Sequence, residues 1–198
     1  PSFRANDVTR ECDLIEEISR INGFDKIAPT LPNKNVTPVI TSEEKNIGKI
    51  RHLMQNAGLN EIQTSSLIGK PLLERFMMNY DDNTAVKVLN SVSEESSMLR
   101  QSLTPCMLNC LKYNFDNGQK SFWAYEIGKT YISERPADVK SAGVKETQIL
   151  EGIISGEVEN SKWQINSQPD FYTIKGIVEN LLNYVGLKNR YSFEKTTT

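Results

Sequence analysis

The sequence lacks the side chains on which several kinds of enzyme depend. Its 198 residues contain one histidine, His52, and three cysteines. A single histidine on an amphipathic stretch cannot support a Ser/His/Asp or Cys/His site, so we interpret it as a surface residue. An odd number of cysteines argues against a disulfide framework and for a reducing compartment. Cys106 and Cys110 are four residues apart on a predicted helix, where small buried side chains are a better interpretation than a zinc site.

Long apolar runs and an excess of one charge are also missing. No apolar stretch approaches the ~18 residues of a membrane span, and no signal peptide opens the chain. The net charge is −2, so nothing global points to nucleic acid or to an anionic membrane. The sequence has no GxxxxGK[ST] motif, which excludes a P-loop. Because the chain begins at Pro1 without a methionine, we expect a fragment of a longer protein. Its apolar content of 38% predicts a soluble protein, and we expect a cytoplasmic one.

What is present falls into two parts joined by a proline-containing stretch. Residues 1–28 are predicted to be the tail of a small domain. Residues 29–40 contain three prolines and no hydrophobic periodicity, which is typical of an extended linker. Residues 41–198 alternate helical and strand patterns and predict one larger domain.

Four acids stand in ordered positions in the first part: Asp7, Asp13, Glu16 and Glu17. The last three are spaced i, i+3 and i+4, so they share one face if this stretch is a helix. Thr9 is the predicted N-cap and Gly23 the predicted end of that helix. An apolar stripe runs beside the acids and is formed by Leu14, Ile15, Ile18 and Ile21.

Two interpretations of the acid face remain open from the residues alone. It is either a solvated face balanced by Arg10 and Arg20, or a site for a hard cation. Acids at this spacing repel one another by roughly a few tenths of a kcal/mol per exposed pair, and a divalent ion would reverse that sign. Oxygen-only ligands suit Mg²⁺. A general acid/base pair of Glu16 and Glu17 is disfavoured, because neighbours on a helix point about 100° apart.

The stretch PSFRANDVTRECDLIEEISRINGFDKIAPTLP resembles the end of the B5 domain in the β subunits of bacterial-type phenylalanyl-tRNA synthetases. The family pattern is an aspartate, a six-residue step to D-L-I-E-E, and a helix ending in a glycine-aromatic pair and a proline. Gly23-Phe24 with Pro29 or Pro32 matches that ending. In the family the acids hold Mg²⁺ at the contact with the α subunit. The resemblance therefore implies the metal ligands Asp7, Asp13, Glu16 and Glu17.

The larger part predicts an α+β fold, in which helices flank an antiparallel or mixed sheet. The predicted helices cover residues 41–57, 70–78, 104–115 and 171–185. The predicted strands cover residues 60–68, 85–89, 121–132 and 148–158, and a further strand begins at 191–194. Residues 134–147 are predicted to be a polar loop, and Trp163 to open a short further segment.

Residue alternation assigns faces within these elements. In the strand 121–132, one face carries Phe122, Ala124 and Glu126, and the other carries Trp123, Tyr125, Ile127 and Tyr131. In the helix 104–115, Thr104 with Pro105 is predicted to form the N-cap and first turn. The inward residues of this helix are predicted to be Leu108, Leu111 and Phe115.

The resemblance continues through the larger part. GLNEIQTSSLI, VLNSVSEESSMLRQSLTPCMLNCLKYN, FWAYEIGKTYI and DFYTIKGIVENLL are similar, in order and spacing, to blocks of the β-subunit core domain. That domain is built like a class II aminoacyl-tRNA synthetase core but has lost catalysis. The resemblance implies that it packs against the catalytic α subunit in an α2β2 heterotetramer. It also implies that tRNA(Phe) is bound through the whole assembly.

The residues agree with a loss of catalysis. A class II site holds ATP phosphates with an arginine on its motif 2 strand, usually in an arginine-any-glutamate arrangement. In the comparable strand Glu126 is present, but Ala124 stands where that arginine would be. We therefore assign no catalytic and no cofactor-binding residue. Glu94, Glu95 and Arg100 are interpreted as ordering a loop or meeting a partner chain.

The sequence thus predicts a structural, non-catalytic segment of a phenylalanine–tRNA ligase β subunit. The whole enzyme would attach phenylalanine to its tRNA with ATP. The alternative is a stand-alone class II-like paralogue with its own adenylating or ligand-binding role. A nucleic-acid module is disfavoured by the near-neutral charge and the acidic helix.

Overall fold

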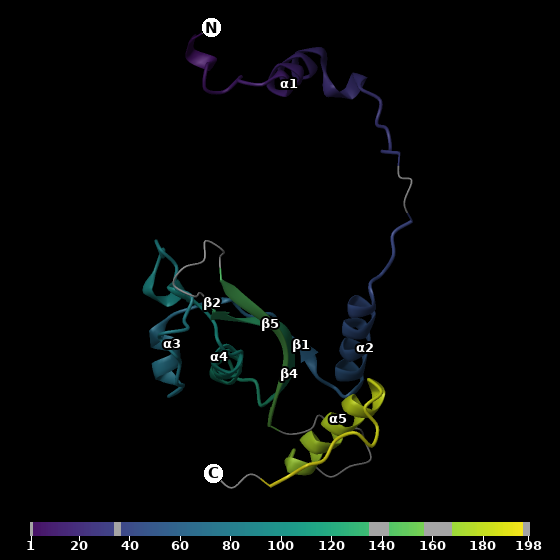
Figure 1. Cartoon of the computed structure of the whole chain (residues 1–198), viewed down its shortest axis with the longest axis vertical. Coiled ribbons are helices and arrows are strands. Elements are labelled where there is room, and N and C mark those ends of the chain that lie inside the picture. Colours follow the sequence, from purple (N-terminus) through teal and green to yellow (C-terminus); the bar gives the residue numbers. More distant parts are fainter. Residues whose placement is uncertain (1, 34–36, 135–142, 157–167, 196–198) are drawn as a thin grey trace. The chain divides into compact units, whose positions relative to one another are not determined.

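The computed structural model describes residues 2–33, 37–134, 143–156 and 168–195. The chain divides into two units, Pro1–Ile40 and Thr41–Thr198. Each unit is described by itself, and Figure 1 labels the elements of both. No helix in the described ranges is both long enough and apolar enough to cross a membrane.

The first unit contains one α-helix and two short 3-10 turns. Its elements are η1 (Ser2–Arg4), α1 (Glu11–Asn22) and η2 (Phe24–Lys26). The predicted helix and its end are confirmed, since Gly23 has φ 98° and its N–H donates to the Ser19 carbonyl. The predicted cap is wrong, because Arg10 occupies the N-cap position and Thr9 precedes it. None of the residues described in this unit is buried.

The second unit is built on a mixed sheet in the order β1-β4-β5. The strands β4 (Ser121–Ser133) and β5 (Val144–Gly156) pair antiparallel along their full length. The short β1 (Asn60–Glu61) pairs parallel with β4. A separate antiparallel pair joins β2 (Leu67–Ile68) to β3 (Met98–Leu99). The predicted α+β class with a mixed sheet is confirmed.

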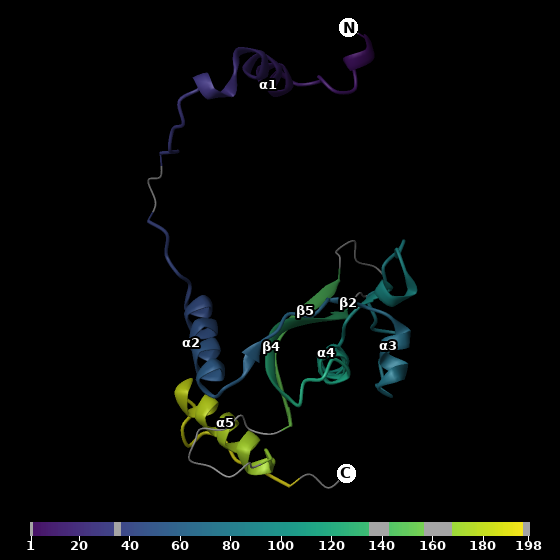
Figure 2. The same ribbon diagram turned by 180° about the vertical axis from the view of Figure 1, so that it is seen from behind.

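Helices flank this sheet on two sides. The four α-helices of the unit are α2 (Ser42–Asn56), α3 (Lys70–Arg75), α4 (Thr104–Asp116) and α5 (Phe171–Tyr184). A 3-10 turn, η3 (Glu94–Ser96), precedes β3. Figures 1 and 2 show α3 and α4 on one side of β4 and β5, and α2 with α5 on the other. All four predicted helices are confirmed within a few residues.

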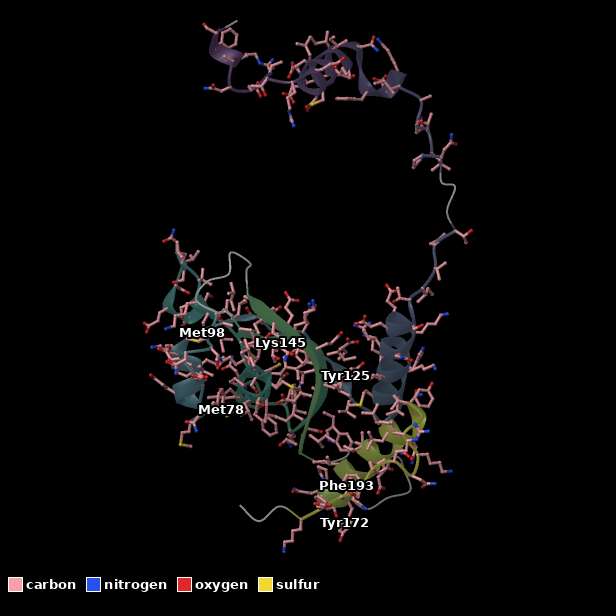
Figure 3. All side chains as sticks on the ribbon, in the orientation of Figure 1. Met78, Met98, Tyr125, Lys145, Tyr172 and Phe193 are labelled. Atoms are coloured by element: carbon pink, nitrogen blue, oxygen red, sulfur yellow. The ribbon has the colours of Figure 1, made fainter. Side chains whose placement is uncertain are left out.

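Two apolar clusters form the core. The first joins Met54 of α2 and Leu59 to Tyr125 of β4, with Trp123 and Ile127 packed beside them. Figure 3 shows Tyr125, which is 0% exposed, between the strand and α2. The second cluster contains Ile68, Leu73, Met98 and Cys106. Each fully buried apolar side chain stabilises the fold by about 1.5–3 kcal/mol. The predicted burial of Cys106 is therefore confirmed, and β4 contributes buried residues from both faces, Ala124 and Glu126 on one and Tyr125 on the other.

The predicted strand at 60–68 is divided into β1 and β2, which belong to different sheets. Ser65 causes the break. Its Oγ accepts a hydrogen bond from the Leu67 N–H at 3.1 Å and donates one to the Leu67 carbonyl at 2.9 Å. Such a local bond offers the backbone an alternative to a sheet ladder.

Other boundaries also differ from the prediction. Residues 85–89 form only an isolated bridge, Lys87 to Met98, and residues 191–194 form no strand. The strand β5 begins at Val144, inside the predicted loop 134–147, because cross-strand ion pairs support its polar start. These pairs are Lys129–Glu146 at 2.6 Å and Lys145–Glu134 at 3.2 Å.

The predicted inward face of α4 is wrong in part. Leu103 stands at the N-cap, and the buried residues of the helix are Pro105, Cys106 and Met107. Leu108 and Leu111, predicted inward, are half-buried, whereas Phe115 is 40% exposed. The helix therefore packs most closely through its first turn. The segment predicted at Trp163 lies outside the described residues.

Candidate functional site

The acid segment holds two of its four carboxylates on one arginine. Arg4 Nη2 lies 2.6 Å from Asp7 Oδ2 and 2.8 Å from Glu17 Oε1. The Arg4 Nε donates a further bond to Asp7 Oδ2 at 3.0 Å. Arg20 Nη2 binds the other oxygen of Glu17 at 2.6 Å. The structure thus brings Asp7 and Glu17 together, with a guanidinium between them.

The other two acids do not join this pair. Asp13 Oδ2 accepts the backbone N–H groups of Thr9 at 3.1 Å and Arg10 at 2.9 Å, so its carboxylate caps α1. Its Oδ1 is 3.1 Å from Arg10 Nη2. Glu16 is exposed. Within the described ranges, no group of three or more His, Cys, Asp or Glu residues is placed to hold a metal ion. The four-acid Mg²⁺ site stays a prediction.

Neighbouring arginines keep two of these acids ionised. Hydrogen bonds from Arg4 and then Arg20 lower the pKa of Glu17 to about 2. The hydrogen bond from the Arg10 side chain, followed by the backbone bonds at the cap, lowers the pKa of Asp13 to about 2. The same contacts with Glu17 and Asp7 raise the pKa of Arg4 above its ordinary value. The segment is therefore a set of charged pairs at neutral pH.

A hard cation fits this segment only in part. Its donors are carboxylate oxygens, the ligand type that Mg²⁺ prefers. Asp7 and Glu17 already contact one common cationic nitrogen. Asp13, however, accepts backbone hydrogen bonds at the start of α1, and Glu16 does not lie with Asp7 and Glu17 in a group that could hold a metal ion. The arrangement as it stands satisfies a guanidinium rather than a four-ligand metal ion.

A second charged centre lies inside the other unit. Arg100 Nη2 is 2.8 Å from Glu126 Oε1, and each side chain is only 2–3% exposed. The Thr64 hydroxyl donates to Glu126 Oε2 at 2.6 Å and accepts from Arg100 Nη1 at 2.7 Å. Arg100 Nε donates to the Lys129 carbonyl at 2.9 Å. All three guanidinium nitrogens are therefore engaged inside the protein.

Gly128 makes room for this centre. A Cβ at Gly128 would clash with the Arg100 guanidinium, and would lie 2.8 Å from Glu126 Oε1 and 2.9 Å from Leu103 Cδ2. Arg100 lies close to Glu94 and Glu95 in the sequence, but the structure pairs it with Glu126. The sequence contains a signal for this pair. Arg100 follows the apolar residues Met98 and Leu99, and Glu126 lies within the apolar strand FWAYEIG. Because buried charges occur in pairs, the two could have been matched.

The buried centre leaves no guanidinium for a phosphate on this sheet. Neither β4 nor β5 contains an arginine. Ala124 is 1% exposed, and Glu126 on the same face is bound to Arg100. Preorganised cations aimed at the reacting phosphates are what phosphoryl chemistry requires. The described part of the sheet provides no guanidinium for this role, and its lysines Lys129 and Lys145 are paired with Glu146 and Glu134.

Cys106 and Cys110 do not supply a reactive thiolate either. Cys106 and Cys110 line a groove of about 440 Å³ together with Thr64, Arg75 and Asn109. Burial raises the pKa of both thiols above the ordinary value. They are therefore protonated at neutral pH, whereas the thiolate is the reactive form. His52 is exposed, as predicted.

The fold defines the class of the larger unit. It is an α+β domain with a buried ion pair, Arg100–Glu126, beside its sheet. A family model described as "Phenylalanyl tRNA synthetase beta chain CLM domain" matches residues 27–198. The chain therefore belongs to the phenylalanyl-tRNA synthetase β chain family.

Relatives from several bacteria carry the name phenylalanine–tRNA ligase beta subunit. The protein from Halalkalibacterium halodurans is 31% identical over 194 residues, which are 97% of this chain and 24% of that protein. The Staphylococcus epidermidis protein is 33% identical over 188 residues, 93% of this chain and 23% of that one. The chain thus spans about a quarter of the length of these curated relatives.

A solved structure of a pyrrolysyl-tRNA synthetase from Desulfitobacterium hafniense is also similar. It is 15% identical, with a TM-score of 0.49, and the match covers 74% of this chain and 44% of that one. A score this low carries no argument about function.

Proposed function

We propose that this chain is a structural, non-catalytic segment of the β subunit of a cytoplasmic phenylalanine–tRNA ligase. The whole enzyme attaches phenylalanine to its tRNA with ATP. Family membership and relatives of that name support the assignment to the subunit. In this proposal residues 1–28 are the end of a B5 domain, residues 29–40 a linker, and residues 41–198 the core domain.

The buried Arg100 centre is the observation that carries the non-catalytic role. A working site would leave a cation on the sheet free to hold ATP. Here the arginine that reaches the sheet donates to Glu126, Thr64 and the Lys129 carbonyl. Releasing it would leave a buried carboxylate unpaired, at a cost of about 3–5 kcal/mol. The centre therefore supports the fold rather than a reaction.

The segment would act by assembly with the catalytic α subunit in an α2β2 heterotetramer. tRNA(Phe) would be bound through that whole assembly. The apolar stripe of α1 supports a need for further contacts, because Leu14, Ile15, Ile18 and Ile21 are 54–80% exposed. Burial of such a stripe stabilises an association by roughly 25 cal/mol per Å² of apolar surface.

Mg²⁺ is the cation proposed for the acid segment, with the ligands Asp7, Asp13, Glu16 and Glu17. The all-oxygen donor set and the proximity of Asp7 to Glu17 support it. A bound Mg²⁺ would neutralise the repulsion among these acids at the subunit contact. Asp7 and Glu17 would hold the ion first. Asp13 and Glu16 would have to turn toward it when the partner subunit is present.

Co-purification with the α subunit tests this function. The chain is compared with an Asp13→Ala/Glu17→Ala variant, each with and without EDTA. We expect the unmodified chain to bind, and the variant and the chelated sample to bind less. No association of the unmodified chain under Mg²⁺ would contradict the assembly role. Equal binding in all samples would contradict the metal contact and leave assembly to residues 41–198.

A further inference from the structure

We propose that the groove between α3 and α4 binds a short apolar peptide with two free ends, whose carboxylate contacts Arg75 and whose ammonium contacts Glu95. The groove lies in the larger unit, where α3 packs against both α4 and η3 (Figure 1). Its volume of about 440 Å³ is within the ~300–1,000 Å³ of ligand pockets in proteins. The inference goes beyond the proposed function and does not depend on it.

Arg75 forms the positive end of the groove. It is the last residue of α3, and its Nη1 donates to Asn109 Oδ1 of α4 at 3.1 Å. This bond to a neutral amide holds the guanidinium between the two helices without neutralising its charge. In the described part of the chain, Arg75 forms no ion pair. Its Nε and Nη2 are therefore available to bind a carboxylate as a fork.

Glu95 forms the negative end of the groove. It belongs to η3, and its Cα would lie 2.7 Å from a Cβ placed on Gly69, the N-cap of α3. The Glu95 carboxylate has no hydrogen bond or ion pair among the described residues. A free acid at this end repels phosphates and other anions of high charge. Together with Arg75 it favours a zwitterion.

The separation of these two ends indicates the length of the ligand. Gly69 and Arg75 are six positions apart on α3, which is a rise of about 9 Å. An extended chain covers roughly 3.3 Å per residue, so about three residues span that distance. A single amino acid carries its ammonium and its carboxylate on one carbon and is shorter than this span.

The middle of the groove suits apolar side chains. Its walls include Ile68, which is buried, Leu72, which is half-buried, and Tyr113, which is 68% exposed. The hydroxyls of Thr64 and Ser65 also line the groove, but both already form hydrogen bonds within the protein. A ligand would therefore find polar partners at the two ends and apolar surface between them.

Titration of the 198-residue chain with the tripeptide Ala-Leu-Ala tests the proposal. Binding is followed by the backbone amide chemical shifts of α3 and α4. The same titration is repeated with the C-terminal amide of the peptide and with its N-acetylated form. We expect each capped peptide to bind about three- to fivefold more weakly, on the scale of exposed ion pairs. Free leucine should bind more weakly than all three.

Two variants assign the ends of the peptide. Arg75→Gln should weaken Ala-Leu-Ala by about three- to fivefold and leave its C-terminal amide unchanged. Glu95→Gln should weaken Ala-Leu-Ala to the same degree and leave the acetylated peptide unchanged. Glu74→Gln is the matched control on α3, because Glu74 is exposed but does not line the groove. Arg190→Gln removes a positive charge elsewhere on the surface, and neither control should change the affinity.

Several results would overturn the proposal. These are unchanged α3 and α4 amides in the presence of Ala-Leu-Ala, equal binding of the free and capped peptides, and leucine binding as tight as that of the peptide. An Arg75→Gln variant that weakens the acid and the amide peptide equally would also contradict it, because the carboxylate would not be what Arg75 recognises. None of these titrations contains the α subunit, so their failure leaves the proposed assembly role standing.

The converse also holds. Failure of co-purification with the α subunit would contradict the assembly role without affecting this groove.

Discussion

Two arginines in this chain make nearly the same contacts in opposite surroundings. Arg4 bridges Asp7 and Glu17 at 2.6 and 2.8 Å, and Arg100 binds Glu126 at 2.8 Å. The Arg4 side chain is 32% exposed and Arg100 only 3%. Water screens the first set of pairs, whereas the second lies in a low-dielectric interior.

The difference separates a replaceable charge from a structural one. Solvent and salt weaken an exposed ion pair, so little of the stability of the fold depends on Arg4. A buried pair that loses one partner leaves an uncompensated charge, which fixes Arg100 in place. Distances alone would not have distinguished the two. The predictions below test that distinction, from the largest expected effect to the smallest.

Arg100→Met should be the most damaging of these changes. It strands the Glu126 carboxylate in the interior and should lower the free energy of unfolding by about 3–5 kcal/mol. Urea unfolding followed by tryptophan fluorescence measures it.

Arg100→Met/Glu126→Gln is the matched control. It removes the stranded charge and should recover part of the loss. If Arg100→Met lowers the free energy of unfolding by less than about 1 kcal/mol, Arg100 contributes no more than an exposed pair does. That result would contradict the distinction between Arg100 and Arg4.

Gly128→Ala tests how tightly the buried centre is packed. The added methyl would lie against the Arg100 guanidinium and 2.9 Å from Leu103 Cδ2. Overpacking of this kind should lower the free energy of unfolding by about 1–3 kcal/mol. Gly48→Ala, inside α2 with no heavy atom within 4 Å of the new Cβ, should instead raise it by about 0.5–1 kcal/mol. The same urea titration compares both, and equal effects would contradict the packing argument.

Thr41→Ala examines the helix cap at the start of α2. The Thr41 Oγ1 accepts the Glu44 N–H at 3.2 Å, and the Glu44 carboxylate accepts the Thr41 N–H at 2.8 Å. Loss of this capping box should destabilise α2 by about 1 kcal/mol. Thr41→Ser keeps the hydroxyl and should stay close to the unmodified protein. A loss in Thr41→Ser as large as in Thr41→Ala would show that the hydroxyl is not the cause.

Acid titration probes the exposed arginine pairs. The pKa of Glu17 is about 2, below its ordinary value of 4.5, because Arg4 and Arg20 stabilise the carboxylate. Its contribution to stability is therefore present above about pH 4.5 and is lost as the pH falls toward 2. Side-chain carboxyl NMR should show the Glu17 pKa rising toward 4.5 in Arg4→Gln.

Asp170 provides the control for that titration. Its pKa is lowered by the Thr173 cap, not by an arginine, so Arg4→Gln should leave it unchanged. A Glu17 pKa that stays near 2 in the variant would mean that Arg20 alone holds the carboxylate.

Periodicity and capping chemistry predicted most of the regular elements. The four helices of the larger unit follow local signals such as Thr41 with Glu44 and the apolar face of α5. The long strand at Ser121–Ser133 follows its apolar and aromatic content. Each of these signals lies within a single element, so the sequence is sufficient to predict that element. The α+β class follows from their order.

Most of the misses have a different cause, which is contact between separate segments of the chain. The divided strand at 60–68 is the exception, since it depends on a local bond of Ser65. The polar start of β5 depends on ion pairs to Lys129 and Glu134. The pair of Arg100 and Glu126 joins the residue after β3 to the middle of β4, which periodicity cannot bring together. Likewise, spacing placed the acids of α1 on one face, but it could not show that Arg4 binds two of the four.

ATP–pyrophosphate exchange dependent on phenylalanine tests the central claim most directly. The chain is assayed alone, the catalytic α subunit alone, and the two together, at equal protein concentrations. We predict no exchange above background for the chain alone, because Arg100 is buried against Glu126 and the described strands β1, β4 and β5 carry no arginine. Exchange should be found only where the α subunit is present. Exchange by the chain alone, abolished by Glu126→Gln, would show a working adenylating site and contradict the account.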